Sequence, residues 1–196
     1  MSFATQFVEG QVPRGVFILC KGRVKLSVCS SDGRTLILRI AEPGEVLGLS
    51  AIVSGTSYEV TAEAMDPCQI TFVQRDDFLH FLQKHPDACL QVAKELSRKY
   101  TSTCRDIRGV VLAHSAEEKL AKLLLEWSAK NGEATKAVPQ LKLALTHEEI
   151  AHIIGTSRET VTRLFSELKK QEIVQCEGKT LVIRKIAALK AMVINQ

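Results

Sequence analysis

Charged residues in one short segment near the end of the chain have the types and spacing that read bases in double-stranded DNA. Arg158, Glu159 and Arg163 lie in the segment SRETVTR, together with Thr162. Arginine forms paired hydrogen bonds with O6 and N7 of guanine, and glutamate accepts a hydrogen bond from the amino group of cytosine. These four residues form the predicted base-reading set.

The segment Thr146–Arg163 has the pattern of a helix-turn-helix, which would place these side chains at the start of its second helix. Thr146 followed by Glu149 predicts a capping box, and Gly155 permits the left-handed backbone of a turn. Ser157 then caps the second helix, whose apolar residues recur on one face. These apolar residues are Val161, Leu164, Phe165 and Leu168. A recognition helix presents the N-terminal residues of its opposite face to the major groove.

Two short β-rich runs follow the helices, on either side of Glu177–Gly178. They predict a hairpin, the wing of a winged helix. A shorter β-rich run, Val138–Leu145, precedes the helices. These elements predict a compact C-terminal module in which Lys179 can meet a phosphate.

Other interpretations of the same residues predict a different chemistry. An ordinary helical hairpin shares the glycine turn, and Glu159 and Arg163 have the spacing of an i,i+4 ion pair.

The segment from His147 to His152 resembles the zinc-peptidase motif HExxH, whose two histidines lie four residues apart on one helix face. Here they lie five apart, about 140° around the helix axis. We expect no enzyme, no catalytic residue and no metal site.

The composition fits a globular protein of one or two domains, because 45% of the 196 residues are hydrophobic. The chain shows no secretion signal and no run of 18 or more apolar residues. We therefore expect a cytoplasmic protein without a membrane partner. The net charge is +4, and residues 115–196 contribute 13 Lys/Arg against 10 Asp/Glu. This excess is too small to identify a nucleic-acid partner by itself.

The first 75 residues alternate short β-branched runs with turn signals at Lys21–Gly22, Asp32–Gly33 and Pro43–Gly44. This spacing predicts a sandwich or jelly roll over residues 1–75. Such a domain can bury a core and enclose a pocket.

The hydrophobic period changes at Asp76. A short helix ends at Pro86, and a longer helix runs from about Asp87 to Ala113. Its seam residues recur in alternating steps of four and three, which favours parallel pairing of two helices in a homodimer. The seam residues are Cys89, Ala93, Leu96, Tyr100, Thr103, Ile107 and Val110. Ser115 caps the next helix, so residues 76–113 form a helical region and residues 114–196 the winged helix-turn-helix domain.

The β-roll, the long dimer helix and the winged helix together resemble the Crp/Fnr family of bacterial transcription regulators. The stretches EGQVPRGVFILCKGRVKLS and LTHEEIAHIIGTSRETVTRLF show the resemblance most clearly, and it covers essentially the whole chain. It implies an α+β fold with an N-terminal jelly-roll (double-stranded β-helix) sensor domain, a long dimerisation helix and a C-terminal winged helix-turn-helix. It also implies RNA polymerase as a partner. Family members usually have a few dozen residues before the strand that contains QFVEGQ, whereas this chain begins almost inside the roll.

The resemblance also implies what the recognition helix reads. Arg158, Glu159 and Arg163 stand where cyclic-AMP-receptor-like members carry their three base-reading residues. A palindromic operator with TGTGA-type half-sites is therefore implied, with half-site centres about one helical turn apart. Phosphate contacts set register and affinity without reading sequence. The residues implied for such contacts are Thr146, Ser157, Thr160 and Lys179.

The sensor departs from the cyclic-nucleotide pattern of the family. The tentative effector pocket comprises Gly44, Glu45, Gly48, Leu49, Tyr58 and Glu59. Cyclic-nucleotide members have a glutamate at the place of Leu49 and an Arg-Ser/Thr pair near Tyr58–Glu59. The chain has no Lys or Arg from Gly44 to Gln74, and a buried phosphate needs such a partner. We expect an effector other than cyclic AMP, whose identity the sequence leaves open.

Other ways of controlling the regulator remain as alternatives to an effector in the pocket. The pocket can be filled by the chain's own Leu49, Ile52, Val53 and Tyr58, which would make the regulator constitutive. Regulation through cysteine oxidation is also open, although cytosolic cysteines without CxxC pairs are usually buried thiols. The six cysteines are Cys20, Cys29, Cys68, Cys89, Cys104 and Cys176. Neither these cysteines nor His80 and His85 have the pattern of an iron–sulfur or haem site. A last alternative is an interaction module that no longer binds DNA.

Overall fold

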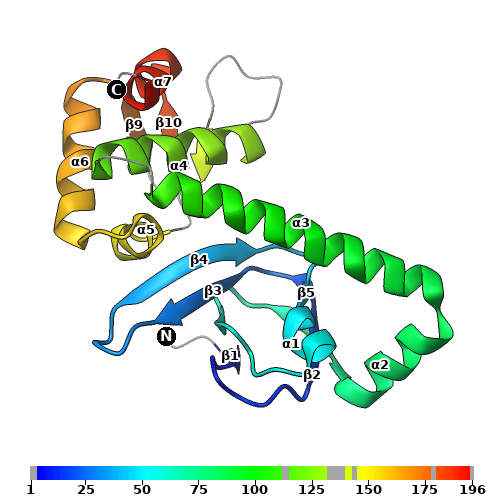
Figure 1. Cartoon of the computed structure of the whole chain (residues 1–196). Helices are drawn as coiled ribbons and strands as arrows, with labels where there is room; N and C mark the ends of the chain where they lie inside the picture. Colours follow the sequence, from blue (N-terminus) through cyan, green and yellow to red (C-terminus); the bar gives the residue numbers. More distant parts are fainter. Residues whose placement is uncertain (1–3, 112–114, 132–139, 143–144, 178–179, 195–196) are drawn as a thin grey trace. The chain divides into compact units, whose positions relative to one another are not determined.

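The computed structural model describes residues 4–111, 115–131, 140–142, 145–177 and 180–194 (Figure 1). The chain divides into two compact units, Met1–Thr103 and Cys104–Gln196. In the described residues, no helix is long and apolar enough to cross a membrane.

The N-terminal unit is built on two antiparallel sheets, as the alternating pattern predicted (Figure 1). One sheet has the order β1 (Thr5–Phe7), β6 (Thr61–Ala64), β3 (Val24–Cys29) and β4 (Thr35–Ala41). The other has the order β5 (Val46–Leu47), β2 (Gly15–Lys21) and β7 (Gln69–Gln74). The predicted turn glycines Gly22, Gly33 and Gly44 have φ of 85°, 81° and 96°, a backbone that glycine adopts without strain.

Two apolar clusters stabilise this unit. The first includes Phe7, Leu19 and Tyr58, and the rings of Phe7 and Tyr58 stack with centroids 4.0 Å apart. The second includes Val16, Leu49 and Ile52, with side chains of the helices packed against it. Strand β2 contributes to both clusters, with Leu19 in the first and Val16 in the second.

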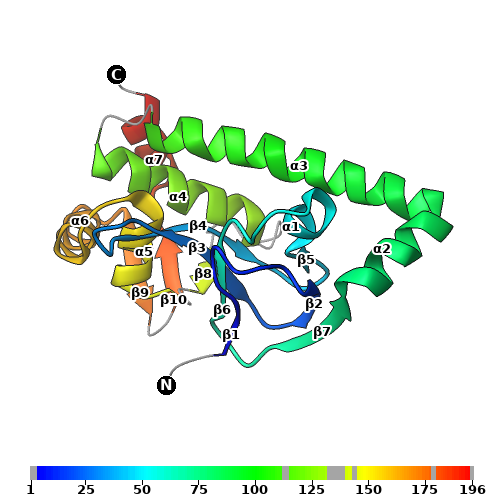
Figure 2. The ribbon, with the colours of Figure 1, turned by 60° about the horizontal axis from the view of Figure 1, so that its bottom comes forward.

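Two helices and the first part of a third belong to the N-terminal unit. The short α1 (Leu49–Ser54), which the sequence analysis did not predict, lies between Gly48 and Gly55. It packs with α2 (Arg75–Lys84) against β2 (Figure 2). The long α3 (Pro86–Val111) begins at a proline, which is favoured at the first helical position. The bounds of α2 and α3 agree with the predicted short and long helices.

The C-terminal unit begins within α3 and continues with α4 (Ala116–Asn131), whose first turn is capped by Ser115 through the amide of Glu118 at 3.1 Å. The helix-turn-helix follows as α5 (His147–Ile154) and α6 (Arg158–Lys170). A three-stranded antiparallel sheet has the order β8 (Gln140–Lys142), β10 (Thr180–Ile183) and β9 (Val174–Glu177). Strands β9 and β10 form the predicted wing hairpin.

A further helix, α7 (Ile186–Ile194), follows the hairpin and packs beside α4 (Figure 1). The sequence analysis did not predict this helix. One apolar cluster joins it to the rest of the unit through residues that are fully buried. They include Leu120, Leu124, Ile150, Phe165, Leu181 and Leu189. The helix-turn-helix is thereby supported on a single core.

Candidate DNA-binding site

Both helices of the helix-turn-helix begin at the predicted caps. Thr146 and Glu149 form a reciprocal capping box, with the Glu149 amide donating to Thr146 Oγ1 at 3.2 Å. The Thr146 amide donates to Glu149 Oε2 at 2.8 Å. Gly155 ends α5 with a left-handed φ of 66°, and Ser157 Oγ accepts from the Thr160 amide at 3.2 Å. These contacts satisfy amides that would otherwise lack partners at the helix starts.

The two helices pack through buried apolar residues. Ile150, Ala151 and Ile154 are buried on α5. On α6, the predicted stripe of Val161, Leu164, Phe165 and Leu168 is buried. Because one face of α6 is anchored in the core, its opposite face is held outward.

The predicted base-reading residues Arg158, Glu159, Thr162 and Arg163 are all exposed on that opposite face. They lie in the first half of α6, and the buried residues Val161 and Phe165 of the same helix face the core. Within the described residues, no ion pair joins Glu159 to Arg163. The arrangement therefore presents two guanidinium groups, a carboxylate and a threonine from one rigid surface.

The start of α6 also controls the charge of Glu159. Its own backbone N–H, the Ser157 hydroxyl and nearby Arg158 all lower the pKa of this carboxyl below its usual value. The group is in the first turn, where the helix dipole also favours an anion. Glu159 is therefore a carboxylate, an acceptor only, at neutral pH.

The residues proposed for phosphate contacts occupy helix starts. Thr146 is the N-cap of α5, and Ser157 and Thr160 lie at the N-terminus of α6 with hydroxyl groups 3.0 Å apart. The Thr146 hydroxyl also donates to Glu149 Oε2 at 2.9 Å. Lys179 lies outside the described residues. Helix N-termini offer backbone N–H groups and a favourable dipole to a phosphate.

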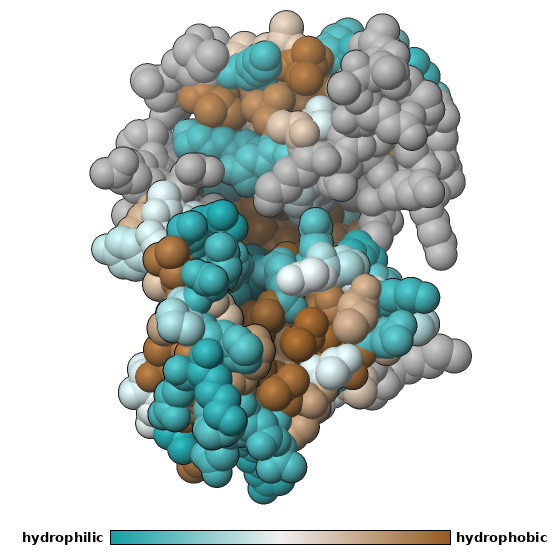
Figure 3. All heavy atoms as spheres, turned by 90° about the vertical axis from the view of Figure 1, so that its right-hand side faces the viewer, coloured by the Kyte–Doolittle hydropathy of each residue, from teal (hydrophilic) through white to brown (hydrophobic). Residues whose placement is uncertain are grey.

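The predicted seam residues lie along α3. Cys89, Ala93, Tyr100 and Thr103 are exposed, with Tyr100 at 73%, whereas Leu96 is half-buried against the roll. Ile107 and Val110 belong to α3, but their side chains lie outside the described part of the chain. Figure 3 shows apolar side chains gathered on one face of the molecule. The large apolar side chains that the N-terminal unit exposes include Phe72, Phe81, Leu90 and Tyr100.

The tentative effector residues lie around the β5–α1 connection. Leu49 and Tyr58 are only 3% and 4% exposed, and the Tyr58 hydroxyl donates to the Gly15 carbonyl at 2.7 Å. Gly48 has a φ of 75°, and a Cβ there would approach the Tyr58 ring to 2.7 Å. Gly44 and Glu59 are exposed. Aromatic and aliphatic side chains of the protein thus fill the region between these residues.

Two cationic side chains from outside the segment Gly44–Gln74 contact residues of this segment. Arg39 of β4 pairs with Glu45 at 2.6 Å. Lys99 of α3 donates to the Val46 carbonyl at 2.9 Å and pairs with Glu95 at 3.7 Å. Burial lowers the pKa of Lys99, as does nearby Arg39, while Glu45 and Glu95 oppose this shift. The sequence analysis missed both cations because they lie outside this segment, Arg39 six residues from Glu45 and Lys99 53 residues from Val46. Each already has protein partners.

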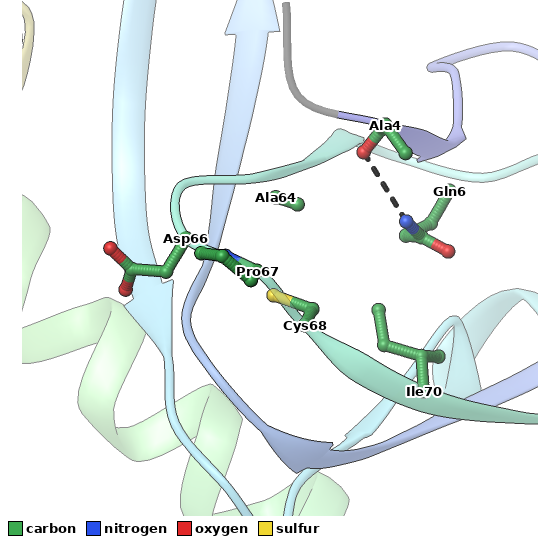
Figure 4. A pocket seen from close by; sticks show the side chains of 7 residues that line it. All are labelled: Ala4, Gln6, Ala64, Asp66, Pro67, Cys68 and Ile70. Carbon is green, nitrogen blue, oxygen red and sulfur yellow. Dashed lines mark hydrogen bonds between the residues drawn. The ribbon is translucent and has the colours of Figure 1, made fainter.

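A separate hollow of about 340 Å³ opens beside β1, β6 and β7. Figure 4 shows its lining residues, Ala4, Gln6, Ala64, Asp66, Pro67, Cys68 and Ile70. Its ionisable groups are engaged elsewhere, because Asp66 pairs with Arg23 at 2.7 Å and Cys68 Sγ donates to the Arg23 carbonyl at 3.3 Å. The Arg23 guanidinium also lowers the pKa of Asp66. The remaining polar side chain of the lining, Gln6, donates from Nε2 to the Ala4 carbonyl at 3.2 Å.

Known proteins match both units. Residues 118–192 match the family model of the Crp-like helix-turn-helix domain, and residues 4–85 that of the cyclic nucleotide-binding domain. The chain is 27% identical over 183 residues to the cAMP-activated global transcriptional regulator CRP of Pasteurella multocida (strain Pm70), covering 93% of this chain and 87% of that protein.

Solved structures show the same fold. FixK2 from Bradyrhizobium japonicum aligns over 97% of this chain and 93% of that chain, with a TM-score of 0.78 and 26% identity. A CooA mutant from Carboxydothermus hydrogenoformans aligns over 98% of this chain and 84% of that chain, with a TM-score of 0.81 and 23% identity. These matches confirm the predicted α+β class with an N-terminal β domain and a C-terminal helix-turn-helix.

Proposed function

Because the chain belongs to the Crp/Fnr family of transcription regulators, we propose that it is a homodimer that reads a palindromic operator through α6. The observation that carries this proposal is the exposure of Arg158, Glu159, Thr162 and Arg163 on one face of a capped, core-anchored helix. A major groove is wide enough to admit such a helix. An interaction module without DNA binding would have no need of this set of residues.

The residue types suggest a TGTGA-type half-site. Arg158 and Arg163 suit guanine, and Glu159 suits the amino group of cytosine on the opposite strand. Each good contact discriminates against a wrong base by about 1–3 kcal/mol. The hydroxyl groups at Thr146, Ser157 and Thr160, with Lys179, would contact phosphates and set the register.

Two-fold symmetry would place two copies of α6 in successive major grooves, about 34 Å apart. The exposure of Ala93 and Tyr100 on α3 supports such a dimer, because pairing of two α3 helices along the seam would cover them. RNA polymerase would be the protein partner at a promoter. The regulator would act in the bacterial cytoplasm, where its DNA lies.

The input to the roll is an effector other than cyclic AMP. Leu49 and Tyr58 occupy the interior, and the nearest cations, Arg39 and Lys99, are engaged with Glu45 and with Glu95 and the Val46 carbonyl. A cyclic phosphate would have to displace these partners. The same burial favours a second candidate, a constitutive regulator whose pocket is filled by its own side chains.

The direct test of DNA reading is Arg158→Ala on a panel of operators in which each guanine of the half-site is changed in turn. The variant should lose its preference at one guanine by about ten-fold or more and keep it at the others. Lys170→Ala is the matched control, since it removes the same charge from the other end of α6. Equal base preference in Arg158→Ala and the original protein would exclude this role for Arg158.

A further inference from the structure

We propose that His147 is a positioning residue for DNA reading, which holds the Thr162 hydroxyl in its hydrogen bond to the Arg158 carbonyl so that Thr162 offers its methyl group to a thymine. This inference rests on the proposed function and names a contact within it. It is carried by one chain of hydrogen bonds that links α5 to the reading face of α6.

The direction of these hydrogen bonds follows from the groups involved. Thr162 Oγ1 lies 2.9 Å from the Arg158 carbonyl, which can only accept, so the Thr162 hydroxyl donates its single hydrogen there. His147 Nδ1 lies 2.9 Å from the same oxygen. Since the hydroxyl hydrogen is already used, Nδ1 must carry the hydrogen and donate to Thr162.

The imidazole of His147 is held in place from two sides. It belongs to the first residue of α5, directly after the capping-box residue Thr146. Its ring stacks on Phe165 of α6, with centroids 5.1 Å apart and an interplanar angle of 3°. Phe165 is fully buried, so the imidazole packs against a side chain that the core holds in place. The Nδ1–H group is thus fixed relative to α6.

The charges facing His147 favour its neutral form. Burial is the main cause that lowers its pKa, and Lys169 and Arg158 of α6 lower it further. Glu148 and Glu149 are the charged neighbours on α5 itself. The Nδ1–H donor is present in the fixed neutral tautomer and in the protonated ring alike. The positioning of Thr162 therefore does not depend on the charge of His147.

The consequence concerns what Thr162 can recognise. With its hydrogen bound to the Arg158 carbonyl, Thr162 cannot donate to the acceptors of guanine, adenine or thymine. Its methyl group remains, and a threonine methyl makes apolar contact with the C5-methyl group of thymine. Thr162 lies four residues after Arg158 and three after Glu159, on the same helix face. The thymine should therefore neighbour the bases read by these two residues.

The experiment removes one methyl group at a time from the DNA. Fluorescence anisotropy at fixed salt measures binding to the TGTGA-N6-TCACA duplex with each thymine replaced in turn by deoxyuridine. The loss of one buried methyl should weaken binding about four-fold at one thymine position. Thr162→Ser, which keeps the hydroxyl and lacks the methyl, should bind the thymine and uracil duplexes equally. Thr162→Val, which keeps methyl groups, should retain the difference.

Substitutions of His147 test the positioning. His147→Asn places an amide donor near the position of Nδ1, whereas His147→Gln places it near Nε2. The Asn variant should keep the thymine preference, and the Gln and Ala variants should lose it. Thermal melting of each variant checks that it is folded. The preference of the original protein should also stay constant between pH 8 and pH 6.

Three results would overturn the inference. One is specific binding that is indifferent to uracil at every position, which leaves the proposed function intact. The second is a full thymine preference in Thr162→Ser or in folded His147→Gln. The third is equal binding to operator and scrambled duplexes, which would remove the proposed function as well.

Discussion

The carboxyl group of Glu159 at the start of α6 keeps its negative charge because hydrogen-bond donors of the helix start contact it. Glu159 is held as a carboxylate by N–H and O–H donors, so it can accept from cytosine and cannot donate. Its neighbours Arg158 and Arg163 supply only donors. The hydrogen-bonding pattern of the reading face is therefore unambiguous at neutral pH.

Glu159→Gln should exchange one base preference for another. Glutamine has an amide that pairs with N6 and N7 of adenine, whereas glutamate accepts from cytosine N4. Competition binding against all four bases at each half-site position should show the cytosine preference replaced by adenine at one position, by about ten-fold. An unchanged base profile would show that Glu159 does not contact a base.

His147 should make the stability of the protein depend on pH. Because its pKa is lower in the folded protein than the usual value of about 6.5, the unfolded chain binds the proton more readily. Stability is therefore fully present above pH 6.5 and is lost as pH falls through the folded pKa. Urea unfolding from pH 8 to pH 5 should show a steeper loss than in His147→Asn, which does not titrate. An equal loss of unfolding free energy with falling pH in the original protein and in His147→Asn would contradict this origin of the pH dependence.

At the scale of elements, a buried hydrogen bond from Tyr58 joins the segment between α1 and β6 to the start of β2. Tyr58→Phe would leave the Gly15 carbonyl without the partner that it has at 2.7 Å. An unsatisfied buried acceptor costs about 1–3 kcal/mol. Denaturant unfolding should show a loss of this size, with no change in the secondary structure. A variant as stable as the original protein would mean that water reaches the Gly15 carbonyl.

Local signals predicted the elements that hold the reading residues. The capping box at Thr146, the left-handed Gly155 and the Ser157 cap each involve groups a few residues apart, so the sequence shows them directly. The turns at Gly22, Gly33 and Gly44 belong to the same class, and the turn at Gly33 joins the paired strands β3 and β4. Base-reading roles rest on residue type and exposure, and remain predictions.

Features that depend on the tertiary fold were not predicted. The six-residue α1 is too short for a periodic signal, and α7 is apolar along nearly its whole length. Lys99 reaches the Val46 carbonyl across 53 residues of chain. The bond from His147 to Thr162 crosses from one helix to another. The spacing of residues along the chain cannot predict contacts of this kind.

At the scale of the whole molecule, the exposed face of α3 is expected to pair two chains. Ala93→Glu would bury an unpaired charge in that seam, which is strongly unfavourable. Light scattering should then show a mass near the 21.7 kDa of one chain instead of about twice this value. Operator affinity should fall at least about 100-fold, since two half-sites are no longer bound together.

Gln91→Glu serves as the control for this variant. It adds the same charge to an exposed position of α3 outside the seam and should leave both mass and affinity unchanged. A dimer that survives Ala93→Glu would place the dimer contact elsewhere in the molecule.

The measurement that tests the central claim most directly is fluorescence anisotropy on the TGTGA-N6-TCACA duplex and on a scrambled duplex of the same length. It is made at one fixed salt concentration, because phosphate contacts make affinity depend strongly on salt. We predict at least about 1,000-fold tighter binding to the palindrome, equal with and without cyclic AMP. Equal affinity for the two duplexes would contradict DNA reading by α6. Preference that appears only with cyclic AMP would contradict the assignment of the sensor pocket.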